Sequence, residues 1–216
     1  MIFGPDQSSW KCSLDSSNVY SSKTMANKID SIILPRTNVG DATIRNNLIP
    51  QKVGIFVWRV LKGRIAVKVE LAKRGIDSGS LLCPICKDTP ESIDHALLSC
   101  KLFHEVWTGI HKWWKINMPP GFDLKMALAS TTYNNLPTRS LKTWQAILWT
   151  TSYMLWKNRN QKVFNDDSWC LAKIISEIQV KTFEWIGNRS RKLHKDWLTW
   201  LLDPINLVSP VNFVPG

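Results

Sequence analysis

The stretch around which this chain is organised lies at residues 82–100 and reads LCPICKDTPESIDHALLSC. It holds three of the five cysteines and one of the four histidines of the 216-residue chain, in the order Cys-x2-Cys-x8-His-x4-Cys. A structural zinc ion takes four thiolate or imidazole ligands in a tetrahedron, and a Cys-x2-Cys turn can bring both its sulfurs to one ion. The stretch therefore predicts a closed, structural zinc site with no open position for a catalytic water.

The predicted zinc ligands are the four donors of this motif, Cys83, Cys86, His95 and Cys100. Thr89 as N-cap, followed by Pro90, predicts a helix that carries His95 on its second turn. Cys100 follows His95 by five residues, which is about 140° around an ideal α-helix. We therefore expect the helix to tighten or break near Ser99.

Three alternatives to this ligand set are open. His104 follows Cys100 by four residues and is an alternative fourth ligand. Cys83 and Cys86 could form a redox Cys-x-x-Cys pair, although the βαβ context that such a pair needs is not evident. The cysteines could also be ordinary core residues beside an unrelated histidine.

Composition and charge restrict the class of protein. An apolar content of 44% with 12 tryptophans is enough for a buried core. Lysine and arginine exceed the acidic residues by 11, and the pI near 9.6 favours an anionic partner such as nucleic acid over a generically basic protein. An odd number of cysteines and a start without a signal peptide predict a reducing compartment, nucleus or cytoplasm. No apolar run reaches the ~18 residues of a membrane span, so no membrane partner is expected.

The hydrophobic periodicity predicts a mainly α fold. We expect an N-terminal β-hairpin, a helix and a linker in residues 1–47, a zinc-binding helical domain in 48–117, a C-terminal helical region in 118–203 and a loop-like tail in 204–216. The expected helices span about residues 51–62, 67–74, 102–114, 140–158 and 168–191. Tryptophans at helical spacing, such as Trp107 and Trp144, are expected in the core, with stacking on nucleic-acid bases as the alternative.

A basic strip precedes the zinc motif. Residues 51–80 contain two acidic residues and seven basic ones, a net charge of +5, and the basic residues are Lys52, Arg59, Lys62, Arg64, Lys68, Lys73 and Arg74. Such a strip is often only a solvated helix face. Beside a small metal module, however, these side chains could contact the phosphates of RNA or DNA.

Several of these motifs together resemble one known family. They are IPQKV at residues 49–53, FVWR at 56–59, LAKRGI at 71–76, the four Cys and His positions, and Glu91 ahead of His95. Their order and spacing resemble the reverse transcriptase zinc-binding domain of plant non-LTR (LINE-type) retrotransposon proteins, over roughly residues 8–114. Ala66 departs from this pattern, because family members tend to have proline there.

The resemblance implies a structural zinc ion, binding to element RNA or target DNA, and the polymerase domain of a retrotransposon protein as a possible partner. The segment WKNRN at residues 156–160, with Val163 and Phe164, resembles the helical connector that often follows this domain.

Catalytic motifs were not found in the sequence. It shows no aromatic-x-Asp-Asp polymerase signature and no carboxylate cluster of an endonuclease or ribonuclease H, and two-metal nucleotidyl transfer needs converging carboxylates. We therefore expect no catalytic residues and an accessory domain. The alternatives are a zinc-stabilised protein-interaction scaffold, an inert relic, or a fragment of a longer RNA-directed DNA polymerase.

Overall fold

The computed structural model describes residues 46–129, 133, 136–165, 169–190 and 196–208. These residues form a mainly helical fold, as predicted, and they contain no β-strand beyond an isolated bridge between Leu82 and Pro90. The helices are α2 (Gln51–Leu61), α3 (Lys68–Lys73), the π-helix η1 (His95–Ser99), α4 (Lys101–Trp113), α5 (Leu124–Ala129), α6 (Thr138–Asn165), α7 (Leu171–Arg189), α8 (Trp197–Leu202) and α9 (Pro204–Val208). The predicted N-terminal hairpin lies outside the described residues.

Helix α2 follows the apolar pattern of its sequence. Its buried side chains recur at helical spacing and are Val53, Phe56, Val57 and Val60. The helix ends because Gly63 adopts the left-handed conformation (φ +66°), which glycine tolerates, and its N–H donates to Val60 O at 3.0 Å. The helix lies where the sequence predicts it, and its apolar face packs on α6.

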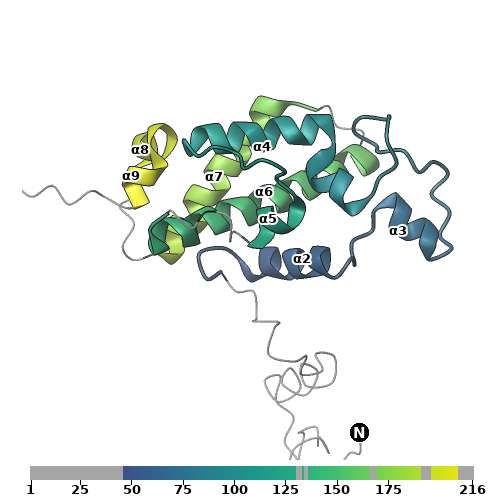
Figure 1. Ribbon diagram of the computed structural model, residues 1–216, viewed down its shortest axis with the longest axis horizontal. Coiled ribbons are helices and arrows are strands. Elements are labelled where there is room, and N and C mark those ends of the chain that lie inside the picture. The colour runs from purple at the N-terminus through teal and green to yellow at the C-terminus, as the bar shows by residue number, and fades with distance from the viewer. Residues whose placement is uncertain (1–45, 130–132, 134–135, 166–168, 191–195, 209–216) are drawn as a thin grey trace, which may run out of the picture. The chain divides into compact units, whose positions relative to one another are not determined.

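Helix α6 is the centre of the fold. It packs against η1, α2, α5, α7 and α9, and Figure 1 shows α2 and α4 on different sides of it. The sequence predicts a helix over residues 140–158, whereas α6 continues to Asn165. Because α6 extends beyond residue 158, Arg159 and Phe164 belong to the same helix as its buried core residues.

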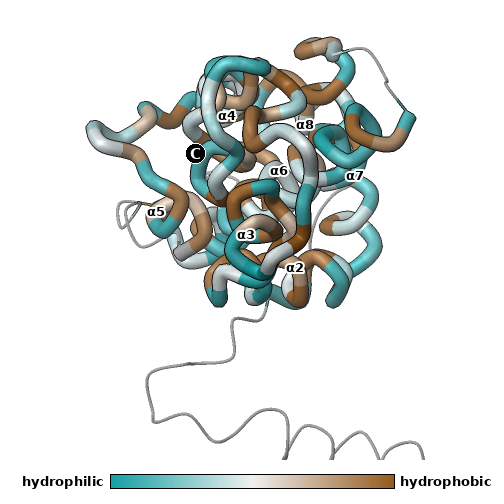
Figure 2. The backbone as a smooth tube through the Cα atoms, turned by 90° about the vertical axis from the view of Figure 1, so that its right-hand side faces the viewer, coloured by the Kyte–Doolittle hydropathy of each residue, from teal (hydrophilic) through white to brown (hydrophobic). Residues whose placement is uncertain are grey.

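The tryptophans mostly build the core. Five of them are fully buried, namely Trp107, Trp114, Trp144, Trp149 and Trp200. The predicted core role is confirmed for these five, because a buried ring cannot stack on a nucleic-acid base. Hydrophobic and hydrophilic residues alternate along the helices in Figure 2, as expected for helices that each bury one face.

Close packing and a helical tail complete the fold. A Cβ added at Gly109 in α4 would lie only 2.5 Å from Ile175 Cδ1 in α7, so glycine allows these two helices to approach closely. Residues 204–208 were expected in a loop-like tail, and that expectation is wrong: they form α9, with Pro204 at its first position and buried. No helix in the described part of the chain is long and apolar enough to cross a bilayer.

Candidate metal centre

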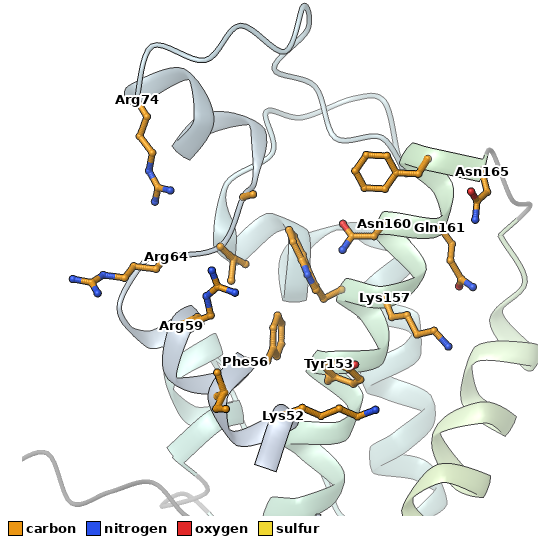
Figure 3. Close-up of a pocket in the computed structure, with 15 residues that line it drawn as sticks. Lys52, Phe56, Arg59, Arg64, Arg74, Tyr153, Lys157, Asn160, Gln161 and Asn165 are labelled. Atoms are coloured by element: carbon orange, nitrogen blue, oxygen red, sulfur yellow. The ribbon is translucent and has the colours of Figure 1, made fainter. Parts of the chain in front are cut away.

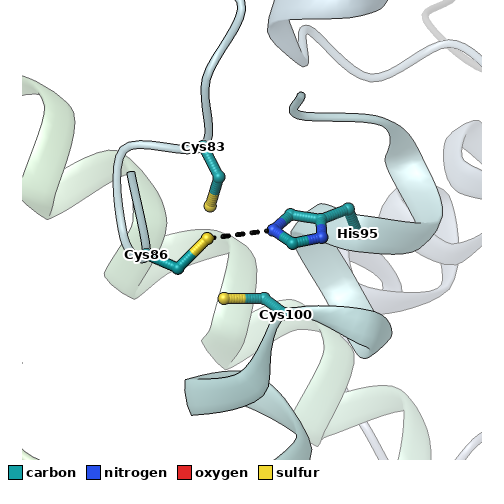
Figure 4. A group of neighbouring side chains, drawn as sticks. All are labelled: Cys83, Cys86, His95 and Cys100. Atoms are coloured by element: carbon teal, nitrogen blue, oxygen red, sulfur yellow. Dashed lines mark hydrogen bonds between the residues drawn. The ribbon is translucent and has the colours of Figure 1, made fainter. Parts of the chain in front are cut away.

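The structure brings the four predicted ligands together. One donor atom from each of Cys83, Cys86, His95 and Cys100 lies within 4.8 Å of every other, and Cys86 Sγ is 3.3 Å from His95 Nε2. Figure 4 shows the three sulfurs and the imidazole pointing toward one another. With zinc–sulfur bonds of about 2.3 Å, the edges of a tetrahedral site measure about 3.8 Å. The side chains are therefore close to the arrangement that zinc requires.

The first two cysteines are held by a tight turn. Lys87 N–H donates to Cys83 O at 2.9 Å, and Lys87 takes the left-handed conformation (φ +58°) that closes the turn. The backbone N–H groups of Ile85 and Cys86 act on the Cys83 sulfur in the direction that lowers its pKa. Cys83 N–H in turn donates to Thr89 O at 2.8 Å, so the base of the loop is closed as well.

The spacing between His95 and Cys100 is accommodated by a π-helix. Cys100 N–H donates to His95 O at 3.1 Å, which is the i→i+5 pattern of a π turn. The chain then leaves helical geometry at Cys100 (ψ 127°) before α4 begins. The helix was expected to tighten or to break near Ser99. The break is present, but the helical turn before it is a wider π turn and not a tighter one.

The predicted start of the His95 helix is wrong. Pro90 pairs with Leu82 in the isolated bridge, so Thr89 caps no helix. Ser92 serves as the cap, because its Oγ accepts from His95 N–H at 3.0 Å. A Thr-Pro pair has the composition of a helix start, and only the pairing with Leu82 shows that the chain is still extended there.

The electrostatics at the sulfurs favour a cation. The pKa of Cys100 is lowered, first because the Cys83 thiol donates to it, and also because the backbone N–H groups of Leu102 and Phe103 at the start of α4 point at its sulfur. Donating to Cys100 raises the pKa of Cys83, and burial adds to this rise. A bound cation would displace the thiol protons of this cluster.

The donor set decides which metal the centre suits. Three thiols and an imidazole match the ligand preference of zinc. His104, the alternative fourth ligand, is exposed and is not part of the cluster. The centre is therefore suited to holding a metal ion through the four predicted ligands.

A buried ion pair that the sequence did not reveal joins the metal loop to α6. The Glu91 carboxylate accepts from Arg159 Nε at 2.7 Å and from Arg159 Nη2 at 2.6 Å, while the Glu91 and Arg159 side chains are only 0% and 6% exposed. Glu91 Oε2 also accepts from Lys68 N–H at 3.0 Å, at the start of α3. We call this arrangement the Glu91–Arg159 clasp. Both residues lie in motifs noted above, but nothing in the sequence pairs residues 68 positions apart.

The basic strip is divided by the fold. Lys52, Arg59, Arg64 and Arg74 line a groove, whereas Lys62, Lys68 and Lys73 do not. Lys73 forms an ion pair with Glu70 at 2.7 Å, one helical turn away.

The groove has a volume of about 590 Å³ and lies between α2 and α6, as Figure 3 shows; we call it the α2–α6 groove. Its lining contains no carboxylate and consists of Lys52, Ile55, Phe56, Arg59, Arg64, Ile65, Ala66, Arg74, Tyr153, Trp156, Lys157, Asn160, Gln161, Phe164 and Asn165. Sequence reasoning missed the contribution of α6, because α6 is distant in the chain from the strip.

Comparison with known proteins supports the zinc assignment. Residues 20–107 match the family described as zinc-binding in reverse transcriptase, and this range includes all four clustered ligands. A protein of Arabidopsis thaliana named "Putative ribonuclease H protein" is 28% identical over 189 residues, which are 82% of this chain and 29% of that protein. The chain therefore spans less than a third of the length of this relative. No solved structure gives a significant match. The predicted resemblance to the reverse transcriptase zinc-binding domain of plant retrotransposon-type proteins is thus confirmed.

Proposed function

We propose that this chain is a non-catalytic accessory domain that binds RNA or DNA through the α2–α6 groove. In this proposal Cys83, Cys86, His95 and Cys100 hold a structural zinc ion. The observation that carries the nucleic-acid part is the charge of the groove, which five basic side chains line without a single acidic one.

These five cations are not neutralised by carboxylates. Lys52 lies near the Tyr153 and Trp185 rings and Arg64 near the Trp58 ring, contacts that do not cancel the positive charge. Lys52, Arg59, Arg64, Arg74 and Lys157 are exposed, and none forms an ion pair with a carboxylate in the described part of the chain. Unpaired positive charges gathered at one concave surface attract a polyanion and release its counterions on binding. A phosphate backbone is the polyanion that matches the family found here.

The metal centre supports this groove indirectly. Val69 N–H donates to Glu91 O at 3.2 Å and Lys68 N–H to the Glu91 carboxylate, so the metal loop anchors the start of α3. Arg64 precedes α3 and Arg74 follows it. A zinc ion that fixes the loop would therefore also fix the positions of these two arginines.

The relative suggests the setting in which the domain works. A reverse transcriptase zinc-binding region and a relative named for ribonuclease H support a role beside the polymerase and nuclease domains of a longer retrotransposon protein. Four described cysteines are free thiols, which supports a reducing compartment such as the nucleus or cytoplasm.

A salt titration of binding tests the proposal. Fluorescence anisotropy with labelled RNA and DNA oligonucleotides should give log–log salt slopes near −3.5 for single strands and −4.5 for duplexes if about five phosphates are contacted. Arg59→Gln and Arg74→Gln should each flatten the slope by about 0.7–0.9.

The matched controls are Lys112→Gln and Lys125→Gln, which remove exposed charges outside the groove and should leave the slope unchanged. Binding that is absent or independent of salt would contradict the proposal and favour the protein-interaction scaffold.

A further inference from the structure

We infer that the α2–α6 groove takes a single-stranded segment of nucleic acid, with its phosphates on the arginines and an unpaired base on Phe164. This inference rests on the proposed function and names the form of nucleic acid that the groove fits. The inference follows from the two walls of the groove, because one carries positive charge and the other carries amides and aromatic rings.

One wall carries positive charge. Arg59 comes from α2, Arg64 from the connection to α3, and Arg74 from the residue after α3, and Figure 3 shows Arg59 and Arg74 pointing toward one another. The Arg59 side chain makes no hydrogen bond within the described residues, and Arg74 makes only a long one of 3.4 Å to Gly63 O. The Arg59 and Arg74 guanidinium groups remain free to take phosphate oxygens. The Arg64 guanidinium lies 5.7 Å from the centroid of the Trp58 ring, and stacking on a ring leaves its N–H edges available.

The opposite wall belongs to α6 and carries amides and aromatic rings. Asn160 and Phe164 are four residues apart, as are Lys157 and Gln161, so each pair follows the same face of the helix from one turn to the next. Arg159 Nη1 donates to Asn160 Oδ1 at 3.0 Å, which leaves the Asn160 amide N–H groups for another acceptor. Amide groups at this spacing suit the edges of bases.

Phe164 is the free stacking surface of the groove. Phe164 is 78% exposed, an unusual state for a phenylalanine on a helix, and its ring makes no aromatic contact within the described residues. The Trp156 ring, by contrast, stacks on the Phe56 ring with 6.2 Å between the two ring centroids, and the Arg159 guanidinium lies 5.0 Å from the Trp156 ring centroid. Trp156 therefore forms the floor, and Phe164 offers the open ring.

These features favour a single strand over a duplex. A volume of about 590 Å³ lies in the range of pockets for small molecules, so it holds a nucleotide or two rather than a helix of paired strands. Paired and stacked bases hide their faces, and only an unpaired base can lie on an aromatic ring while its edge meets an amide. A duplex would contact the arginines alone.

The experiment compares a labelled single strand with a duplex of the same sequence, using the full chain with zinc. Phe164→Ala should weaken single-strand binding by about 5- to 150-fold, the loss expected for one base–aromatic stack, and should leave duplex binding unchanged. Phe164→Leu keeps apolar bulk without a flat ring and should also weaken single-strand binding, whereas Phe164→Trp should preserve single-strand binding. The matched control is Leu202→Ala, which removes a side chain that is 72% exposed on α8, outside the groove.

A fluorescent adenine analogue in the strand adds a direct readout, because stacking on Phe164 should quench it in the wild type and in Phe164→Trp only. The inference would be overturned if the chain bound the single strand and the duplex equally well, or if Phe164→Leu bound the single strand as tightly as the wild type. The proposed function would still stand in either case, provided that binding depends on salt. If the chain binds neither the single strand nor the duplex, both this inference and the proposed function fail. Thermal unfolding of each variant checks that the fold is intact.

Discussion

Removing one partner of the Glu91–Arg159 clasp should destabilise the whole described fold. Arg159→Met deletes two charge-assisted hydrogen bonds, of 2.7 and 2.6 Å, and leaves a 0% exposed carboxylate with Lys68 N–H as its remaining donor. Losing one member of a buried pair costs about 3–5 kcal/mol, a large part of the 5–15 kcal/mol by which a domain is stable. Arg159→Lys keeps the charge without the fork and should lose about 1–2 kcal/mol.

The double variant Glu91→Met with Arg159→Met separates charge burial from packing. It removes both charges and leaves the Lys68 N–H without its acceptor, a loss of about 1–3 kcal/mol in the free energy of unfolding. The Asn160 Oδ1 also loses the Arg159 Nη1 donor, but Asn160 is only half-buried and can turn to water. The double variant should therefore be more stable than Arg159→Met alone.

Urea unfolding of the zinc-loaded chain, followed by circular dichroism, measures these differences. The control is Arg189→Met, an exposed arginine on α7 that should change stability by less than about 0.5 kcal/mol. A loss below about 1 kcal/mol in Arg159→Met, or a double variant no more stable than the single one, would refute the reasoning.

Three further predictions concern the metal centre, a buried histidine and a strained turn. A zinc chelator or Cys86→Ser should lower the melting temperature and the zinc content of the purified chain, whereas Cys170→Ser, at an exposed cysteine outside the cluster, should change neither. Burial lowers the pKa of His111, which is hydrogen-bonded through both ring nitrogens. The unfolded chain takes up a proton at His111 near its ordinary pKa of 6.5, whereas the folded chain takes it up only at lower pH. The melting temperature should therefore fall as the pH drops below about 6.5, and it should fall less in His111→Gln. Lys87→Gly should stabilise the chain by about 1 kcal/mol in urea unfolding, because glycine takes the left-handed conformation without strain, while Lys112→Gly inside α4 should destabilise it by a similar amount.

The local features of the fold could be predicted because neighbouring residues determine them. The periodicity of α2 and the left-handed glycine that ends it are both visible within a dozen residues, and so is the spacing of the metal ligands. The start of the His95 helix could not be predicted, because Thr89-Pro90 suits a helix N-terminus as well as an extended chain. The bridge from Leu82 to Pro90 decides between them.

By itself, the sequence determined that the chain is mainly helical, that its motifs resemble a reverse transcriptase zinc-binding domain, and which four residues could share a metal ion. Donor chemistry and spacing along the chain are enough for these conclusions. Only the tertiary structure decided which cations of the basic strip share a surface, since α2, the residues around α3 and α6 must pack together to form the α2–α6 groove. It also decided that Glu91 meets Arg159, because a buried charge finds its partner in space and the two lie 68 positions apart in the chain.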